Sequence, residues 1–170
     1  MKKILFLAAT LLMTLTVMAE RIPASDSRVT FVGRTMVEGT DVSFDWTGVY
    51  FRIAFTGKSL TMHATDTKWD ATPEMAATRH NYFNVWIDAP MSDEPHRIIE
   101  VASADTIIEL IDPAYLQKSK LTEHTVIVQN RTEGEQGKIT IHGFATDEKG
   151  KFLQAEPIRE RQLEFIGASY

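Results

Sequence analysis

The chain has 170 residues, of which 44% are hydrophobic and 24% are charged, and these proportions are those of an ordinary globular domain with one hydrophobic core. Its 23 acidic residues outnumber its 18 lysines and arginines, and the net charge of −5 disfavours nucleic acid as a partner because phosphate binding needs clustered cations. The sequence has no cysteine, which excludes disulfides, thiolate catalysis and zinc sites built on thiolates.

Residues 1–19 have the composition of a secretory signal peptide. Two lysines precede an apolar run at 4–18, and Val17 and Ala19 are small residues at the positions that a signal peptidase recognises. The apolar run is about 15 residues long, shorter than the roughly 20 that a membrane-spanning helix needs. We therefore predict cleavage before Glu20, a secreted or periplasmic location, and no membrane partner after cleavage.

From Arg28 onward the dominant hydrophobic period is two, which is typical of half-buried strands. In residues 50–55, Phe51, Ile53 and Phe55 alternate with residues that would lie on the opposite face. The same pattern predicts further strands at residues 59–64, 82–88, 96–101, 106–111, 124–132 and 137–144. Turn-forming residues separate these segments, and many short, evenly spaced strands predict an all-β sandwich or jelly roll.

Two segments interrupt the strand pattern. Residues 112–121 begin with Asp112 as a possible cap and Pro113 at a first-turn position, which predicts a helix of two turns at most. The segment 66–81 keeps no period and is long for a hairpin connection, and such loops on a rigid sheet are commonly functional. It contains Trp69, which we take as the ligand-binding candidate.

Aromatic rings stack on the apolar faces of sugars, so each tryptophan of an exported domain is a candidate for sugar binding. In a β-sandwich, however, most aromatic side chains belong to the core, and we expect this of Trp46 and Trp86. The five histidines, at positions 63, 80, 96, 124 and 142, show no metal-ligand spacing. We expect structural or solvent-exposed roles for them, no metal site and no cofactor.

The composition changes again near the end of the chain. Residues 153–162 are polar and have the character of a linker, and residues 163–170 begin a new apolar strand that leads into Gly167, Ala168 and Ser169. Small residues beside a serine at the end of a strand suit a nucleophile turn, in which backbone N–H groups stabilise an oxyanion. Gly-Ala-Ser alone is a weak pattern, and its position on a new strand strengthens it.

Five blocks make the pattern more specific: FVGRT, FDWTGVYFRIAFTGKSL, YFNVWID, HTVIVQNRTEGEQGKITIHGFATDEKGKFL and RQLEFIGAS. In their order and spacing they resemble the acetyl esterases of carbohydrate esterase family 2. The resemblance implies a β jelly roll at residues 20–152 and, at residues 163–170, the first strand of an α/β domain of the SGNH hydrolase type. It also implies that Ser169 is the nucleophile position, with Gly167 and Ala168 in its turn. The family commonly has Asp or Asn where this sequence has Ala168.

In that family the general base is a His near the far end of the α/β domain, and further oxyanion donors lie beyond the serine. No His follows Ser169 in this sequence. We therefore expect the N-terminal part of an exported esterase that acts on O-acetylated plant polysaccharide or sugar esters. We expect it to be inactive alone, because the C-terminal SGNH domain is missing. The alternatives are a stand-alone carbohydrate-binding sandwich without catalysis, and a scaffold domain that does not contact sugar.

Overall fold

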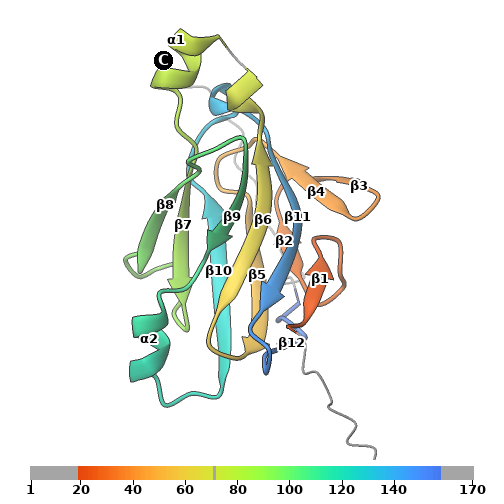
Figure 1. Ribbon diagram of the computed structural model, residues 1–170, viewed down its shortest axis with the longest axis vertical. Coiled ribbons are helices and arrows are strands. Elements are labelled where there is room, and N and C mark those ends of the chain that lie inside the picture. The colour runs from red at the N-terminus through yellow and green to blue at the C-terminus, as the bar shows by residue number, and fades with distance from the viewer. Residues whose placement is uncertain (1–18, 71, 158–170) are drawn as a thin grey trace, which may run out of the picture.

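Two antiparallel sheets packed face to face form the protein (Figure 1). The computed structural model describes residues 19–70 and 72–157. In spatial order the first sheet contains β3 (Met36–Glu38), β4 (Asp41–Phe44), β11 (Ile139–Thr146), β6 (Leu60–Asp66) and β9 (Asp105–Glu109), with β1 (Arg21–Pro23) beside β11. The second contains β12 (Lys151–Leu153), β5 (Tyr50–Thr56), β10 (Glu123–Asn130), β7 (Tyr82–Ile87) and β8 (Arg97–Glu100), with β2 (Thr30–Val32) beside β5.

Each strand predicted from the two-residue period is present, and the predicted all-β jelly-roll sandwich is confirmed. Helix α2 (Pro113–Lys118) also forms as predicted, with the Asp112 carboxylate accepting a hydrogen bond from the Ala114 N–H at 2.8 Å. The unpatterned segment before β7 is more ordered than expected. It contains a 3₁₀ helix, η1 (Thr67–Asp70), and a short α-helix, α1 (Pro73–Thr78).

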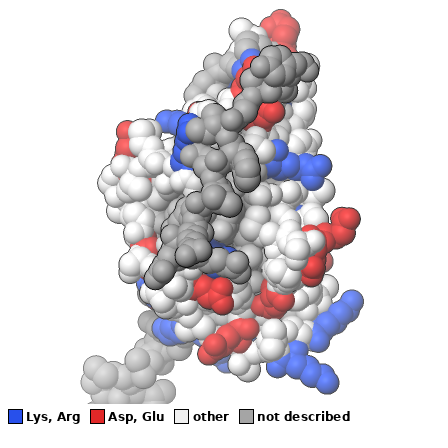
Figure 2. Space-filling model, turned by 180° about the vertical axis from the view of Figure 1, so that it is seen from behind, with Lys and Arg blue, Asp and Glu red and all other residues white. Residues whose placement is uncertain are grey.

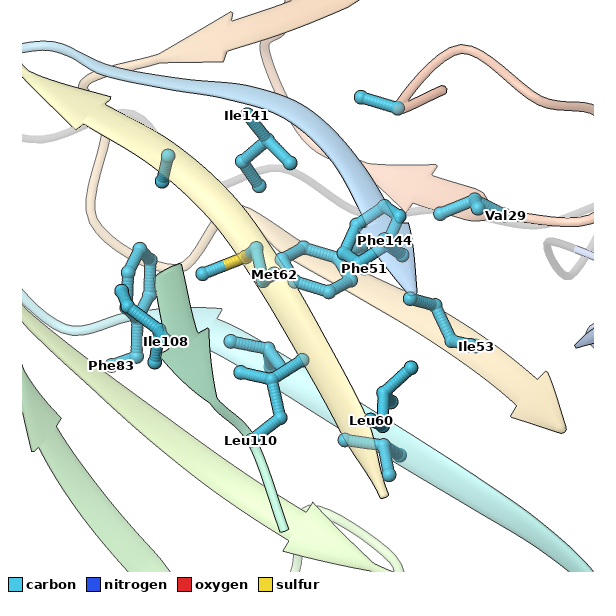
Figure 3. Close-up of a cluster of buried hydrophobic side chains, with 14 of the residues drawn as sticks. Val29, Phe51, Ile53, Leu60, Met62, Phe83, Ile108, Leu110, Ile141 and Phe144 are labelled. Atoms are coloured by element: carbon cyan, nitrogen blue, oxygen red, sulfur yellow. The ribbon is translucent and has the colours of Figure 1, made fainter. Parts of the chain in front are cut away.

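The core lies between the sheets, where alternate residues of each strand meet (Figure 3). Phe51 of β5 is fully buried, and its ring centroid lies 5.3 Å from that of Phe144 on β11 in the opposite sheet. Phe44 of β4 and Phe83 of β7 make a second contact between the sheets, with centroids 6.4 Å apart. Burying each such side chain stabilises the fold by about 1.5 to 3 kcal/mol. This apolar layer holds the two sheets together.

Trp86 is buried, as expected, but not between the sheets. It lies on the outer face of β7, 4% exposed, and its indole Nε1–H donates to the Asp93 carbonyl at 2.8 Å. The connection between β7 and β8 therefore covers it. Among the described helices, none is both long enough and apolar enough to cross a membrane.

The sandwich extends on both sides of the stretch from Arg28 to Phe152 in which alternation is strongest. Ile22 of β1 is 5% exposed, and Ala155, which follows β12, is 1% exposed. A side chain at position 143 would collide with β1, since a Cβ on Gly143 would lie 2.5 Å from the Ile22 carbonyl oxygen. Glycine at this point of β11 allows the first strand to approach.

A charged cluster joins the first described residues to the last strand. The Arg28 guanidinium donates to Glu20 at 2.8 Å and to Asp26 at 2.9 Å, and the second oxygen of Glu20 accepts from the Phe152 N–H at 2.8 Å. These hydrogen bonds hold the pKa of the Glu20 carboxyl below its usual range, with Arg28 as the largest cause. Arg28 also lowers the pKa of Asp26.

This cluster predicts an acid-dependent contribution to stability. A carboxyl whose folded pKa is lowered stabilises the fold above its unfolded pKa of about 4.3, and the contribution is lost as pH falls through the folded pKa. Glu20→Gln should therefore lower the free energy of unfolding by about 1 kcal/mol at pH 7. The difference from wild type should shrink below about pH 4. Urea unfolding of both proteins at pH 7 and below about pH 4 measures this difference in the free energy of unfolding. Glu38→Gln, on the exposed strand β3, removes the same charge and should change little; an equal loss in both variants would contradict the assignment.

Candidate functional site

One end of the sandwich is built from loops that are fastened by buried polar side chains. The ends of β6 and β10 and the starts of β7 and β11 meet there, with α1, η1 and a second 3₁₀ helix, η2 (Gly134–Gln136) (Figure 1). Irregular segments of this kind expose backbone polar groups that need partners when buried. We call this the loop end.

Asn81 is the centre of the polar network at the loop end. It is 1% exposed, and its amide N–H₂ donates to both carboxylate oxygens of Asp66 at 3.0 Å and to the Gln136 carbonyl at 2.9 Å. Its side-chain oxygen accepts from the Thr132 hydroxyl at 2.6 Å. Asp66, itself 3% exposed, also accepts from the Lys68 N–H at 2.9 Å. One amide thus connects β6 of the first sheet to β7 of the second and to η2.

The backbone at Gly137 passes directly against this network. Its φ angle of 117° is in the region that favours glycine. A Cβ at this position would lie 2.7 Å from the backbone nitrogen of Lys68 and 2.8 Å from an Asp66 carboxylate oxygen. The close approach of the chain to η1 therefore needs glycine at this residue.

A second buried amide fixes the turn between β4 and β5. Asn130, 2% exposed, donates from its side chain to the Trp46 carbonyl at 3.0 Å, and its own carbonyl accepts from the Gly48 N–H at 2.9 Å. The Asn130 N–H donates to the Val49 carbonyl at 2.8 Å. The turn that carries Trp46 is thus held at three points.

The prediction that Trp46 belongs to the core is wrong. Its side chain is 56% exposed, and the Arg34 guanidinium carbon lies 4.7 Å from the ring centroid. Strand β4 ends at Phe44, so Trp46 lies in the following turn, where strand alternation no longer decides which side chains point inward. Arg34 and Trp46 come together only because β3 and β4 form a hairpin between them.

Beside Trp46 lies a hollow of about 260 Å³. Its lining combines apolar and polar side chains: Arg34, Thr35, Met36, Ser43, Phe44, Asp45, Trp46 and Lys138. Lys138 is tied to η1, because its N–H donates to the Thr67 hydroxyl at 2.8 Å and its carbonyl accepts from the Thr67 N–H at 3.0 Å. One residue of the lining is therefore hydrogen-bonded to the segment 66–81 that the sequence analysis singled out.

The residues predicted to carry function have different outcomes. The backbone of Trp69 lies in η1, two residues after Thr67, but its side chain is outside what the structure describes. Gly167, Ala168 and Ser169 also lie outside the described residues. Their roles remain predictions.

The histidines include one arrangement that periodicity did not reveal. His124 is 4% exposed, and its Nδ1 lies 2.7 Å from an Asp88 carboxylate oxygen, whose partner oxygen accepts from the Thr125 N–H at 2.8 Å. The pair fastens the end of β7 to β10 and borders a larger hollow, of about 640 Å³, at the end opposite Asn81. His63 and His142 face outward, as alternation predicts, and pair with Asp105 and Asp41 respectively.

These two sheets and their loop end define a jelly-roll β-sandwich domain. The family model described as "Carbohydrate esterase 2 N-terminal" matches residues 31–156, and the chain belongs to this family. The acetylxylan esterase / glucomannan deacetylase of Cellvibrio japonicus is 30% identical over 143 residues, which are 81% of this chain and 33% of that protein.

Solved structures agree on the fold. A family two carbohydrate esterase from Cellvibrio japonicus superposes with a TM-score of 0.64 at 21% identity, covering 84% of this chain and 37% of that one. An acetyl xylan esterase from Butyrivibrio proteoclasticus gives a TM-score of 0.63 at 15% identity, covering 85% and 35%. The chain thus spans about a third of the length of the relatives that it matches.

The network around Asn81 predicts a position-specific stability effect. Asn81→Ala removes hydrogen bonds to a buried carboxylate and should lower the free energy of unfolding by about 2 to 4 kcal/mol. Asn84→Ala, within β7 and on its outer face, should cost less than about 1 kcal/mol. Chemical denaturation measures the free energy of unfolding of both variants, which carry the same change from Asn to Ala at positions three residues apart. Equal losses would contradict the central place of Asn81.

Proposed function

We propose that this chain is the N-terminal domain of an exported acetyl esterase that acts on O-acetylated plant polysaccharide or sugar esters. The observation that carries the proposal is the family match over residues 31–156. The relative from Cellvibrio japonicus is named for deacetylation of xylan and glucomannan, which supports an acetylated polysaccharide as the substrate class. The signal-like residues 1–19 support a secreted or periplasmic location.

In the proposed enzyme, Ser169 is the nucleophile at the start of the catalytic SGNH domain. Its oxygen attacks the acetyl carbonyl, the sugar hydroxyl leaves, and water then releases acetate from the acyl-enzyme. A base must take the serine proton, and oriented N–H donors must stabilise the oxyanion. We assign the base and the further donors to the part of the enzyme that lies beyond this chain. The sandwich contributes a rigid support whose loop end is fixed by Asn81 and Asn130.

The first prediction from this proposal concerns catalysis. The purified chain should hydrolyse 4-nitrophenyl acetate no faster than its Ser169→Ala variant. A serine is a weak nucleophile when it lacks both a general base and a complete oxyanion site. Losing a single oxyanion donor already costs about 100- to 1000-fold in turnover. Turnover above background that vanishes in Ser169→Ala would overturn the assignment of the base to another domain.

A longer polypeptide that includes the catalytic domain provides the positive arm. It should deacetylate acetylated xylan or glucomannan, and Ser169→Ala should abolish that activity. Ser103→Ala provides the matched control, since Ser103 lies in a surface turn and donates only to the Asp105 carbonyl. An active longer protein that tolerates Ser169→Ala would refute the nucleophile assignment.

The second prediction concerns export. Mass spectrometry of the protein from the periplasm or medium should find Glu20, or a residue within a few positions of it, at the N-terminus. Cleavage at this point retains the Glu20 side chain, which binds Arg28 and the Phe152 N–H. An intact Met1 in protein recovered from the cytoplasm would contradict export.

A further inference from the structure

Among the residues that the structure describes, Trp46 is the most exposed aromatic residue. It is 56% exposed, in a turn that follows β4, and the neighbouring residues Met36 and Val37 on β3 are 46% and 60% exposed. Exposing a large indole ring forgoes about 1.5 to 3 kcal/mol of burial that other aromatic residues of this protein obtain. A ring held outside the core at this cost is a candidate for binding.

The ring is also held in place before any ligand arrives. The backbone carbonyl of Trp46 accepts hydrogen bonds from the buried Asn130 side-chain amide at 3.0 Å and from the Val49 N–H at 3.4 Å. The Arg34 guanidinium lies over the ring at 4.7 Å, a favourable cation–π distance that restricts the indole. Because these contacts fix the turn and the ring, binding costs little additional conformational entropy.

The hollow beside the ring supplies the other half of a site. Asp45 and Lys138, both partly exposed, line it with charged side chains of opposite sign, and Met36, which is 46% exposed, contributes apolar surface. Ser43 and Phe44 also line it, but both are buried. The Ser43 hydroxyl is positioned by a hydrogen bond of 3.0 Å to the Thr140 hydroxyl. A half-exposed aromatic ring bordered by charged side chains matches a flat ligand with an apolar face and polar groups at its edge.

A pyranose ring has this chemistry. Its axial C–H groups form an apolar face that stacks on indole, and its equatorial hydroxyls point outward in the plane of the ring, where they meet the rim. A polyanion fits less well, because the net charge is −5 and the lining of the hollow sets the Asp45 carboxylate beside Arg34 and Lys138. On the face of the molecule seen in Figure 2, acidic and basic side chains are interspersed. A quaternary ammonium fits less well too, because the Arg34 guanidinium beside the Trp46 ring repels a second cation.

We propose that Trp46 and the adjacent hollow form a carbohydrate subsite that binds one pyranose unit of a neutral polysaccharide. The choice of a plant polysaccharide as the ligand rests on the proposed function, whereas the site itself rests on Trp46, Arg34 and the lining of the hollow. The subsite would hold the polymer on the sandwich independently of ester cleavage. It would therefore bind deacetylated chains as well as acetylated ones.

The test is affinity electrophoresis of the purified chain in gels that contain deacetylated glucomannan or xylan. We expect retardation by at least one of these polymers and at least a tenfold weaker binding constant for Trp46→Ala. Trp46→Phe, which keeps an aromatic face, should retain part of the binding. Leu121→Ala, which removes a side chain that is 57% exposed at the opposite end of the sandwich, is the matched control and should bind like wild type.

The indole N–H signal of Trp46 in a proton–nitrogen correlation spectrum provides a second readout, and unfolding midpoints show that each variant is folded. The signal should shift when mannohexaose or xylohexaose is titrated. No retardation and no shift with either polymer would overturn the subsite. Retardation that persists in Trp46→Ala, or that occurs only with anionic polymers and disappears in 0.5 M salt, would overturn it as well.

Failure of the proposed function would look different. A longer polypeptide that lacks deacetylase activity, combined with Trp46-dependent retardation of this chain, would remove the esterase proposal and leave the subsite. Deacetylase activity of the longer polypeptide without any retardation of this chain would remove the subsite and leave the esterase proposal.

Discussion

The apolar layer between the two sheets is the interaction on which the rest of the structure depends. With no cysteine in the sequence, no disulfide can link the sheets, and burial of facing side chains must hold them together. Pairs such as Phe51 with Phe144 make that contact near the middle of the strands. Toward the two ends of the sandwich, buried polar side chains join the elements as well.

The division between the apolar middle and the polar ends explains where a binding surface can form. At one end the Asn81 amide joins both sheets through Asp66 and Gln136, and at the other His124 and Asp88 fasten β7 to β10. Such networks are effective only when every member has a partner, and among the described residues no buried side-chain nitrogen or oxygen lacks one. The exposed turn of Trp46 is therefore supported by a rigid base.

The sequence predicted the central strands well because their side chains alternate between core and surface. It missed the short edge strands, whose residues are not segregated in this way: all three residues of β3 are exposed, and those of β2 are half-buried. Trp46 was placed in the core because residue type was the only guide in a turn, and hydrophobicity does not show that Arg34 lies across the ring. The networks of Asn81 and His124 depend on partners 15 or more positions away, which no local period can indicate. The catalytic assignment of Ser169 came from resemblance to a family and not from the geometry of the described residues.

The pairing of β1 with β11 has a consequence for the order of assembly. Arg21 lies opposite Ala145 and Pro23 opposite Gly143, so the first of the described strands pairs, among those strands, only with one near the end of the sandwich. The edge therefore cannot close until almost the whole domain has been synthesised, and pairings of such long sequence separation form slowly. A nascent chain with this topology stays open while it is made. Until β11 has been made, β1 remains available to chaperones and to any machinery that handles extended polypeptides.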